Sequence, residues 1–150
     1  MKNKEYVSII KMIEYIDKAL RYTANCNYKE FSENEEKVDA TVFAISQIGE
    51  LVKNITKETM EKYPNIEWII IKNLRNKIVH DYDGIKLNFI WDIITEDIVQ
   101  LKEKLQIVLE ENKETEEKWV IKWRKSLQAL RLYTHTHTYN LLKKIKRLNI

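Results

Sequence analysis

One short segment, RNKIVHDY, carries most of the side chains in this chain that could do chemistry: Arg75, Asn76, His80 and Tyr82. An arginine is always charged and can hold a phosphate through paired hydrogen bonds. A histidine titrates near neutral pH, so it can act as a general base or a general acid. These types point to chemistry on a phosphate ester, with His80 moving the proton of a 2′-hydroxyl or of the leaving oxygen. Arg75 would offset the charge of the transition state.

Helical geometry limits how these side chains can meet. Asn76 and His80 are one turn apart and share a face, whereas Arg75 and His80 lie about 140° apart on an ideal helix. One regular helix therefore does not direct both at a single phosphate. Either the long arginine bends round, the helix loosens before Gly84, or a second copy of the chain completes the site. A two-fold dimer would bring two Arg75/His80 pairs into one groove that could hold RNA.

A structural interpretation of the same residues stays open on spacing alone. Arg75 and His80 near the end of a helix can simply interact with its last carbonyls and its dipole. No cluster of carboxylates and histidines suggests a catalytic metal, so we expect a metal-independent mechanism and no cofactor. His135 and His137 are two ligands of one type, which make a poor metal site.

The elements that position the segment are predicted to be helices. Two glycines and one proline are too few for a sheet-rich fold with many tight turns. Apolar residues at three- and four-residue steps predict four amphipathic helices joined as an up-down bundle. Asn65 and Asn88 are the expected N-caps of the last two. The helices should cover about residues 6–20, 38–55, 66–83 and 90–108.

Two details of these helices bear on the segment. Ile66, Ile70, Leu74 and Ile78 run at i+4 spacing, which predicts that they form the buried face of the third helix. Gly49 sits within the second helix at a cost of about 1 kcal/mol relative to alanine. Either it is merely tolerated there, or a neighbouring helix approaches it closely.

Composition divides the chain into two parts. It is 44% hydrophobic and 33% charged, which is typical of a folded protein. Residues 118–150 hold nine Lys/Arg and no Asp/Glu, whereas residues 1–117 hold 17 basic and 23 acidic groups. We expect a helical bundle over 1–117 and a basic C-terminal extension over 118–150, partly helical or disordered. The N-terminus resembles neither a signal peptide nor a membrane span, so we expect a cytoplasmic protein.

The segment resembles the Arg-x4–6-His motif of HEPN-domain proteins, in the RX4HXY form of the HepT toxin family. The resemblance extends over about residues 5–112. It includes, in the family's order and spacing, Ile48-Gly49-Glu50, Tyr63-Pro64-x-Ile66-x-Trp68, the motif itself and Trp91. Residues from about 118 onward lie beyond the family's usual extent.

The resemblance implies an all-α HEPN bundle that forms a homodimer with its cleft at the interface. It implies a metal-independent ribonuclease, the toxin of a type VII (HEPN/MNT) toxin–antitoxin system. Arg75 and His80 would be the catalytic pair, supported by Asn76; Glu50 either faces the same cleft or is a solvated surface residue. Tyr82 would be modified with AMP by a partner MntA-like nucleotidyltransferase antitoxin, adding bulk and negative charge. The alternative is a non-catalytic nucleotide- or partner-binding HEPN module that works only in complex with the nucleotidyltransferase.

Overall fold

The computed structural model of the chain describes residues 1–80, 86–114, 121 and 125. The chain divides into two compact units, Met1–Lys113 and Glu114–Ile150. The predicted boundary at 117/118 and almost all of the basic extension lie outside the described residues. None of the helices in the described ranges is long and apolar enough to cross a membrane.

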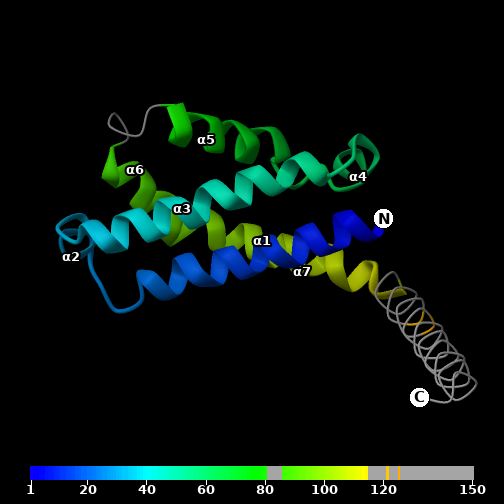
Figure 1. The fold of residues 1–150 in the computed structure, drawn as a ribbon, viewed down its shortest axis with the longest axis horizontal. Helices are drawn as coiled ribbons and strands as arrows, with labels where there is room; N and C mark the ends of the chain where they lie inside the picture. Colours follow the sequence, from blue (N-terminus) through cyan, green and yellow to red (C-terminus); the bar gives the residue numbers. More distant parts are fainter. Residues whose placement is uncertain (81–85, 115–120, 122–124, 126–150) are drawn as a thin grey trace, which may run out of the picture. The chain divides into compact units, whose positions relative to one another are not determined.

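The first unit contains four long helical segments, and successive segments run in opposite directions (Figure 1). α3 lies between α1 and α5, and α1 also packs against α7. The described residues contain no strand. The predicted all-α up-down bundle is therefore confirmed. Its long segments are α1 (Asn3–Tyr22), α3 (Glu35–Leu51), α5 (Trp68–His80) and the continuous run of α6 (Leu87–Asp92), the π-helical η3 (Ile93–Asp97) and α7 (Ile98–Glu111).

The core forms where the apolar periodicity places it. On α1, α3 and α7 the residues at three- and four-residue steps are buried or partly buried, because each helix buries one apolar stripe. Burial of this stripe is the main force that holds the bundle together. The largest of the fully buried core side chains are Ile9, Met12, Ile16, Phe31, Ile48, Val52, Ile90, Ile94, Leu105 and Val108.

Three short elements flank α3: α2 (Tyr28–Ser32), η1 (Val52–Asn54) and α4 (Lys57–Lys62). They fill the connections on either side of α3. In α2 the Asn27 side chain accepts from the Glu30 backbone N–H, and the Glu30 carboxylate accepts from the Asn27 N–H, so the helix start is capped reciprocally. The predicted second helix was too long, because α3 ends at Leu51 and the chain continues as η1.

The predicted starts of the last two long helices were also wrong. α5 begins at Trp68 rather than after a cap at Asn65, because residues 63–67 form a turn. In that turn the Ile66 N–H and the Trp68 indole both donate to the Tyr63 carbonyl, at 3.2 and 3.1 Å. α6 begins at Leu87, so the expected cap Asn88 lies inside the helix.

A buried carboxylate ties the start of α1 to the start of α4. Glu5 is 2% exposed, and its side chain accepts hydrogen bonds from the Thr56 N–H at 2.8 Å, the Thr56 hydroxyl at 2.7 Å and the Lys2 N–H at 2.8 Å. Burial alone would raise the pKa of Glu5, but the hydrogen bonds from Thr56, Lys2 and Thr59 outweigh it and hold the pKa at about 2. The charge is thus fully satisfied inside the fold.

The end of α7 is fixed by a second polar cluster. Tyr63 donates its hydroxyl to Glu111 at 2.9 Å and accepts from the Asn112 amide at 2.8 Å. The same amide donates to the Val108 carbonyl. Together these bonds join the turn before α5 to the last turn of α7.

Candidate active site

Gly49 sets the distance between α3 and α5. A Cβ at this position would lie 2.8 Å from the Ile71 carbonyl oxygen and would overlap the Arg75 side chain at its Cβ. No other residue fits without moving α5. Of the two interpretations of Gly49, close approach of a neighbouring helix is therefore correct. The approach brings Arg75 directly against α3.

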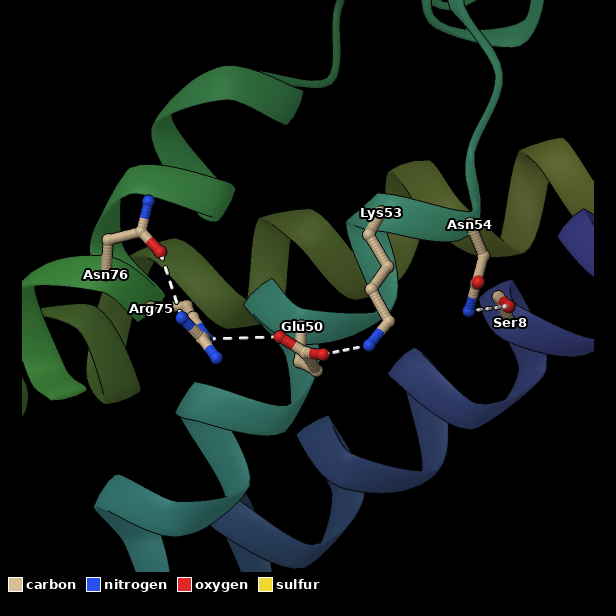
Figure 2. A network of polar contacts seen from close by, with 6 residues as sticks. All are labelled: Ser8, Glu50, Lys53, Asn54, Arg75 and Asn76. Carbon is tan, nitrogen blue, oxygen red and sulfur yellow. Dashed lines mark hydrogen bonds and ion pairs between the residues drawn. The ribbon is translucent and has the colours of Figure 1, made fainter.

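Among the described residues Arg75 makes two polar contacts, and neither of these is to a carbonyl of the last turn of α5. Its Nε lies 3.1 Å from Glu50 Oε2, and its Nη1 donates to Asn76 Oδ1 at 3.1 Å. Figure 2 shows Glu50 between Arg75 on one side and Lys53 on the other. Glu50 thus joins the end of α3 to α5, and it faces the motif rather than solvent alone.

The charges of this cluster explain the ionisation of Glu50. The hydrogen bond from Lys53 lowers the pKa of the Glu50 carboxyl, and this exceeds the opposing effect of burial; the charges of Lys53 and Arg75 lower it further. The side chains of Glu50 and Arg75 are both 32% exposed, so the pair is open to water and to ligands. A guanidinium held in one orientation but still accessible is suited to binding an anion.

The structure brings together three of the five predicted site residues: Glu50, Arg75 and Asn76. His80 is the last residue of α5, one turn after Asn76. Tyr82 lies outside the described residues. Sequence reasoning missed Lys53, although its spacing of three residues from Glu50 is typical of an ion pair on one helix face.

The outer face of α5 is more apolar than predicted. Ile70 was predicted to be buried, but its side chain is 59% exposed, and that of Ile69 is 71% exposed. The other predicted residues of this face, Ile66, Leu74 and Ile78, are buried or partly buried as expected. Ile71 lies on the inner face in place of Ile70, because a strict four-residue step drifts around a helix of 3.6 residues per turn. Two exposed isoleucines therefore lie on the helix that carries the motif.

A pocket of about 160 Å³ lies between α3, α5 and the η3–α7 segment. Its lining is mainly isoleucine and leucine, and it includes Ile71 and Leu74 but not Glu50, Arg75 or Asn76. The charged cluster therefore lies on the surface beside this apolar pocket. The site is a shallow polar surface rather than a deep cavity, which suits an extended substrate better than a small molecule.

The family model for HepT-like proteins, described as Ribonuclease HepT-like, matches residues 12–108, from α1 to α7. The chain belongs to the HepT-like family. Glu50, Arg75, Asn76 and His80 all fall within the matched range. The predicted family is thus confirmed. The roles of the motif residues stay predictions.

Curated relatives agree with this family assignment. A protein of Methanocaldococcus jannaschii named "Putative RNase MJ1216" is 31% identical over 100 residues, which are 67% of this chain and 83% of the relative. A protein of Thermococcus cleftensis named "Probable ribonuclease HepT" is 30% identical over 105 residues, or 69% of this chain and 93% of the relative. No solved structure shows significant similarity to the chain.

Proposed function

We propose that this HepT-like chain is a metal-independent endoribonuclease, the toxin of a type VII toxin–antitoxin system. The observation that carries the proposal is the cluster of Glu50, Arg75 and Asn76, which lies one turn before His80 on α5. It presents an oriented, accessible guanidinium beside the one histidine among the first 134 residues. The ribonuclease names of the relatives support the same activity.

In the proposed reaction a 2′-hydroxyl of the RNA attacks the adjacent phosphorus. His80 accepts the proton of that hydroxyl as a new bond forms between the 2′-oxygen and phosphorus. The bond from phosphorus to the 5′-oxygen breaks, and this leaving oxygen takes up a proton, leaving a 2′,3′-cyclic phosphate. Arg75 holds the phosphate and offsets the negative charge of the transition state, while Glu50 and Asn76 fix the guanidinium.

A homodimer completes the proposed site. On an ideal helix, positions 75 and 80 point about 140° apart, so one α5 does not direct both at the same phosphate. Two copies related by a two-fold axis would supply His80 from one protomer and Arg75 from the other. The exposed Ile69 and Ile70 on the same helix support an interface there, since exposed apolar patches mark interaction surfaces.

The proposed control is covalent modification of Tyr82 by an MntA-like nucleotidyltransferase. The tyrosine oxygen would attack the α-phosphate of ATP, forming a bond to AMP and releasing pyrophosphate. Each AMP adds bulk and negative charge two residues after His80. Negative charge at that point repels the RNA backbone, so the modified toxin no longer binds RNA and is inactive.

Growth arrest on expression tests the activity. We expect His80→Ala and Arg75→Ala to abolish both toxicity and RNA cleavage by the purified chain, with cleavage by wild type persisting in EDTA. Arg21→Ala, which removes an exposed arginine from α1, is the matched control and should behave as wild type. Equal toxicity of wild type and the His80 variant would contradict the nuclease proposal, and a requirement for Mg²⁺ would contradict its metal-independent mechanism.

Mass spectrometry after co-expression with a nucleotidyltransferase tests the control. The chain should gain one or more AMP groups on Tyr82, and Tyr82→Phe should stay unmodified and toxic. If toxicity is blocked without a change in mass, inhibition is by binding alone. That result, together with a chain that cleaves no RNA, would favour the non-catalytic binding module.

A further inference from the structure

The last turns of α5 and the first turn of α6 meet at an exposed cation–aromatic pair. Lys77 Nζ lies 5.1 Å from the centroid of the Phe89 ring. Phe89 is 42% exposed, and Lys77 is exposed as well. A large apolar ring at the surface beside a free ammonium group is not explained by packing in the core. This pair belongs to neither the Glu50 cluster nor the apolar pocket.

The pair lies close to the proposed catalytic residue. Lys77 precedes His80 by three residues, which is about 4.5 Å along the helix axis and about 60° around it. Arg75 lies on the other side of position 80, about 140° away. Positions 77 and 80 thus point to the same side of α5 on an ideal helix, whereas position 75 does not. An RNA chain that reaches position 80 would also pass the Lys77/Phe89 pair.

We propose that Lys77 and Phe89 form a subsite for one nucleotide of single-stranded RNA, which deepens and rests on the proposed ribonuclease function. An unpaired base stacks on the Phe89 ring, and Lys77 contacts the phosphate next to that base. Proteins bind single-stranded nucleic acid through aromatic rings and cations, since every base has a π-face that can stack and every nucleotide carries a negatively charged phosphate. The subsite fixes which phosphate lies at His80.

Exposure distinguishes this pair from a similar one at the other end of the bundle. Lys62 Nζ lies 5.0 Å from the centroid of the Tyr63 ring, but that ring is only 7% exposed and its hydroxyl is bonded to Glu111. No base can stack on a ring that is covered. In Figure 1, α4 and α6 lie at opposite ends of the bundle; α4 ends at Lys62, and α6 contains Phe89. The Lys62 pair is therefore a matched internal control.

A base that is already paired and stacked in a duplex is not available to Phe89. The subsite consequently selects single strands, loops or unpaired ends over double-stranded RNA. This selectivity follows from the stacking ring, and a patch of lysines alone would not produce it.

Equilibrium binding of a fluorescent single-stranded RNA oligonucleotide to the full-length chain tests the subsite, in the His80→Ala background so that the RNA stays intact. We expect Phe89→Leu, which keeps an apolar side chain but removes the ring, to weaken binding about tenfold. Phe89→Tyr keeps the ring and should bind within about twofold of the parent. Binding of an RNA duplex should be the same for all three.

Salt dependence separates the two members of the pair. Lys77→Gln should reduce the slope of log K against log salt by about 0.7, because one phosphate contact on a single strand is lost. Phe89→Leu should lower the affinity and leave the slope unchanged. Lys62→Gln, with the same change of charge, should leave the slope unchanged.

Three results would overturn the subsite. The first is that Phe89→Leu binds RNA as tightly as its parent. If the wild-type chain still cleaves RNA in that case, the proposed function stands without the subsite. A change in oligomeric state of Phe89→Leu by light scattering shows instead that the ring belongs to an interface between copies. If the parent binds no RNA and the wild type cleaves none, the subsite and the proposed function fail together.

Discussion

Glu5 and Glu50 are two carboxylates that each join α1 or α3 to a neighbouring element, yet they are built in opposite ways. Glu5 is buried and is satisfied by neutral donors, the backbone N–H groups of Lys2 and Thr56 and the hydroxyl of Thr56. Glu50 is half-exposed and is held by two cations, Lys53 and Arg75. The pKa of both carboxyls is lowered.

This difference predicts that Glu5 serves the stability of the fold and that Glu50 serves the function of the site. Hydrogen bonds to a buried charge are strong, and leaving such a group without partners is costly, so Glu5 should govern whether the bundle folds. An ion pair in contact with water is weak and screened by salt, so Glu50 should contribute little to stability. Its value lies in orienting Arg75. The substitutions below test this separation.

The largest effect is expected on replacing Glu5. Glu5→Gln removes the charge that the surrounding donors stabilise, and its amide group would face donors of the same kind. From the pKa of about 2 against an ordinary value of 4.5, we expect the free energy of unfolding to fall by about 3 kcal/mol. Chemical denaturation measures this, with the exposed Glu14→Gln of the same helix as control. Equal stability of Glu5→Gln and Glu14→Gln would show that Glu5 does not govern the stability of the bundle.

The same carboxylate predicts how stability depends on pH. Because folding depresses the pKa of Glu5, its contribution is fully present above pH 4.5 and is lost as the pH falls from 4.5 towards 2. The denaturation midpoint of the wild-type chain should therefore fall as the pH is lowered from 4.5 towards 2. Glu5→Gln should show a shallower decline over the same range, and parallel curves for the two proteins would contradict the role given to Glu5.

An intermediate effect is expected at Gly49, which connects the two regions by setting the position of α5. Gly49→Ala gains helix propensity but places a Cβ against Arg75 and the Ile71 carbonyl. We expect a net loss of about 1–2 kcal/mol and a marked loss of RNA cleavage as Arg75 is displaced. Ser46→Ala, one turn earlier on α3, should leave both unchanged. Full activity of Gly49→Ala would show that the close approach does not position Arg75.

The smallest effect is expected on replacing Glu50. Glu50→Gln should lower the rate of RNA cleavage at saturating substrate by about fivefold, because Arg75 loses the charge that orients it. The thermal midpoint should stay at the wild-type value. Glu61→Gln removes a comparable exposed ion pair with Lys57 and should alter neither quantity. A large drop in the thermal midpoint of Glu50→Gln would mean that both carboxylates serve the fold.

The long helices were predictable because apolar spacing is a local signal. The spacing of Ile9, Met12 and Ile16 predicts the buried face of α1 without any information on the helix that packs against it. The short α4 has no such pattern. Its N-cap is Thr56, which is held by a bond to Glu5, 51 residues earlier in the chain. The turn before α5, which displaces the helix start from Asn65, is likewise tied to distant residues, since Tyr63 is bonded to Glu111 and Asn112.

The site was predictable in its residue types but not in its contacts. Spacing identified Arg75, Asn76 and His80 as one segment, yet the partner of Arg75 comes from α3 and is reached only because Gly49 allows the helices to meet. The same sequence left two interpretations of Gly49 and of Glu50 open. The close approach of α3 and α5 decides the first and brings Glu50 into contact with Arg75, and no local pattern encodes it.

The salt bridge between Glu50 and Arg75 has a kinetic consequence under the proposed function. The Glu50 carboxylate offsets part of the positive charge of Arg75, while the guanidinium stays accessible to a phosphate. Arg75 should therefore bind the phosphates of substrate and product less tightly than an arginine without this ion pair, and it keeps a partner when the product leaves. The chain should therefore favour rapid release and repeated turnover over tight retention of cleaved RNA.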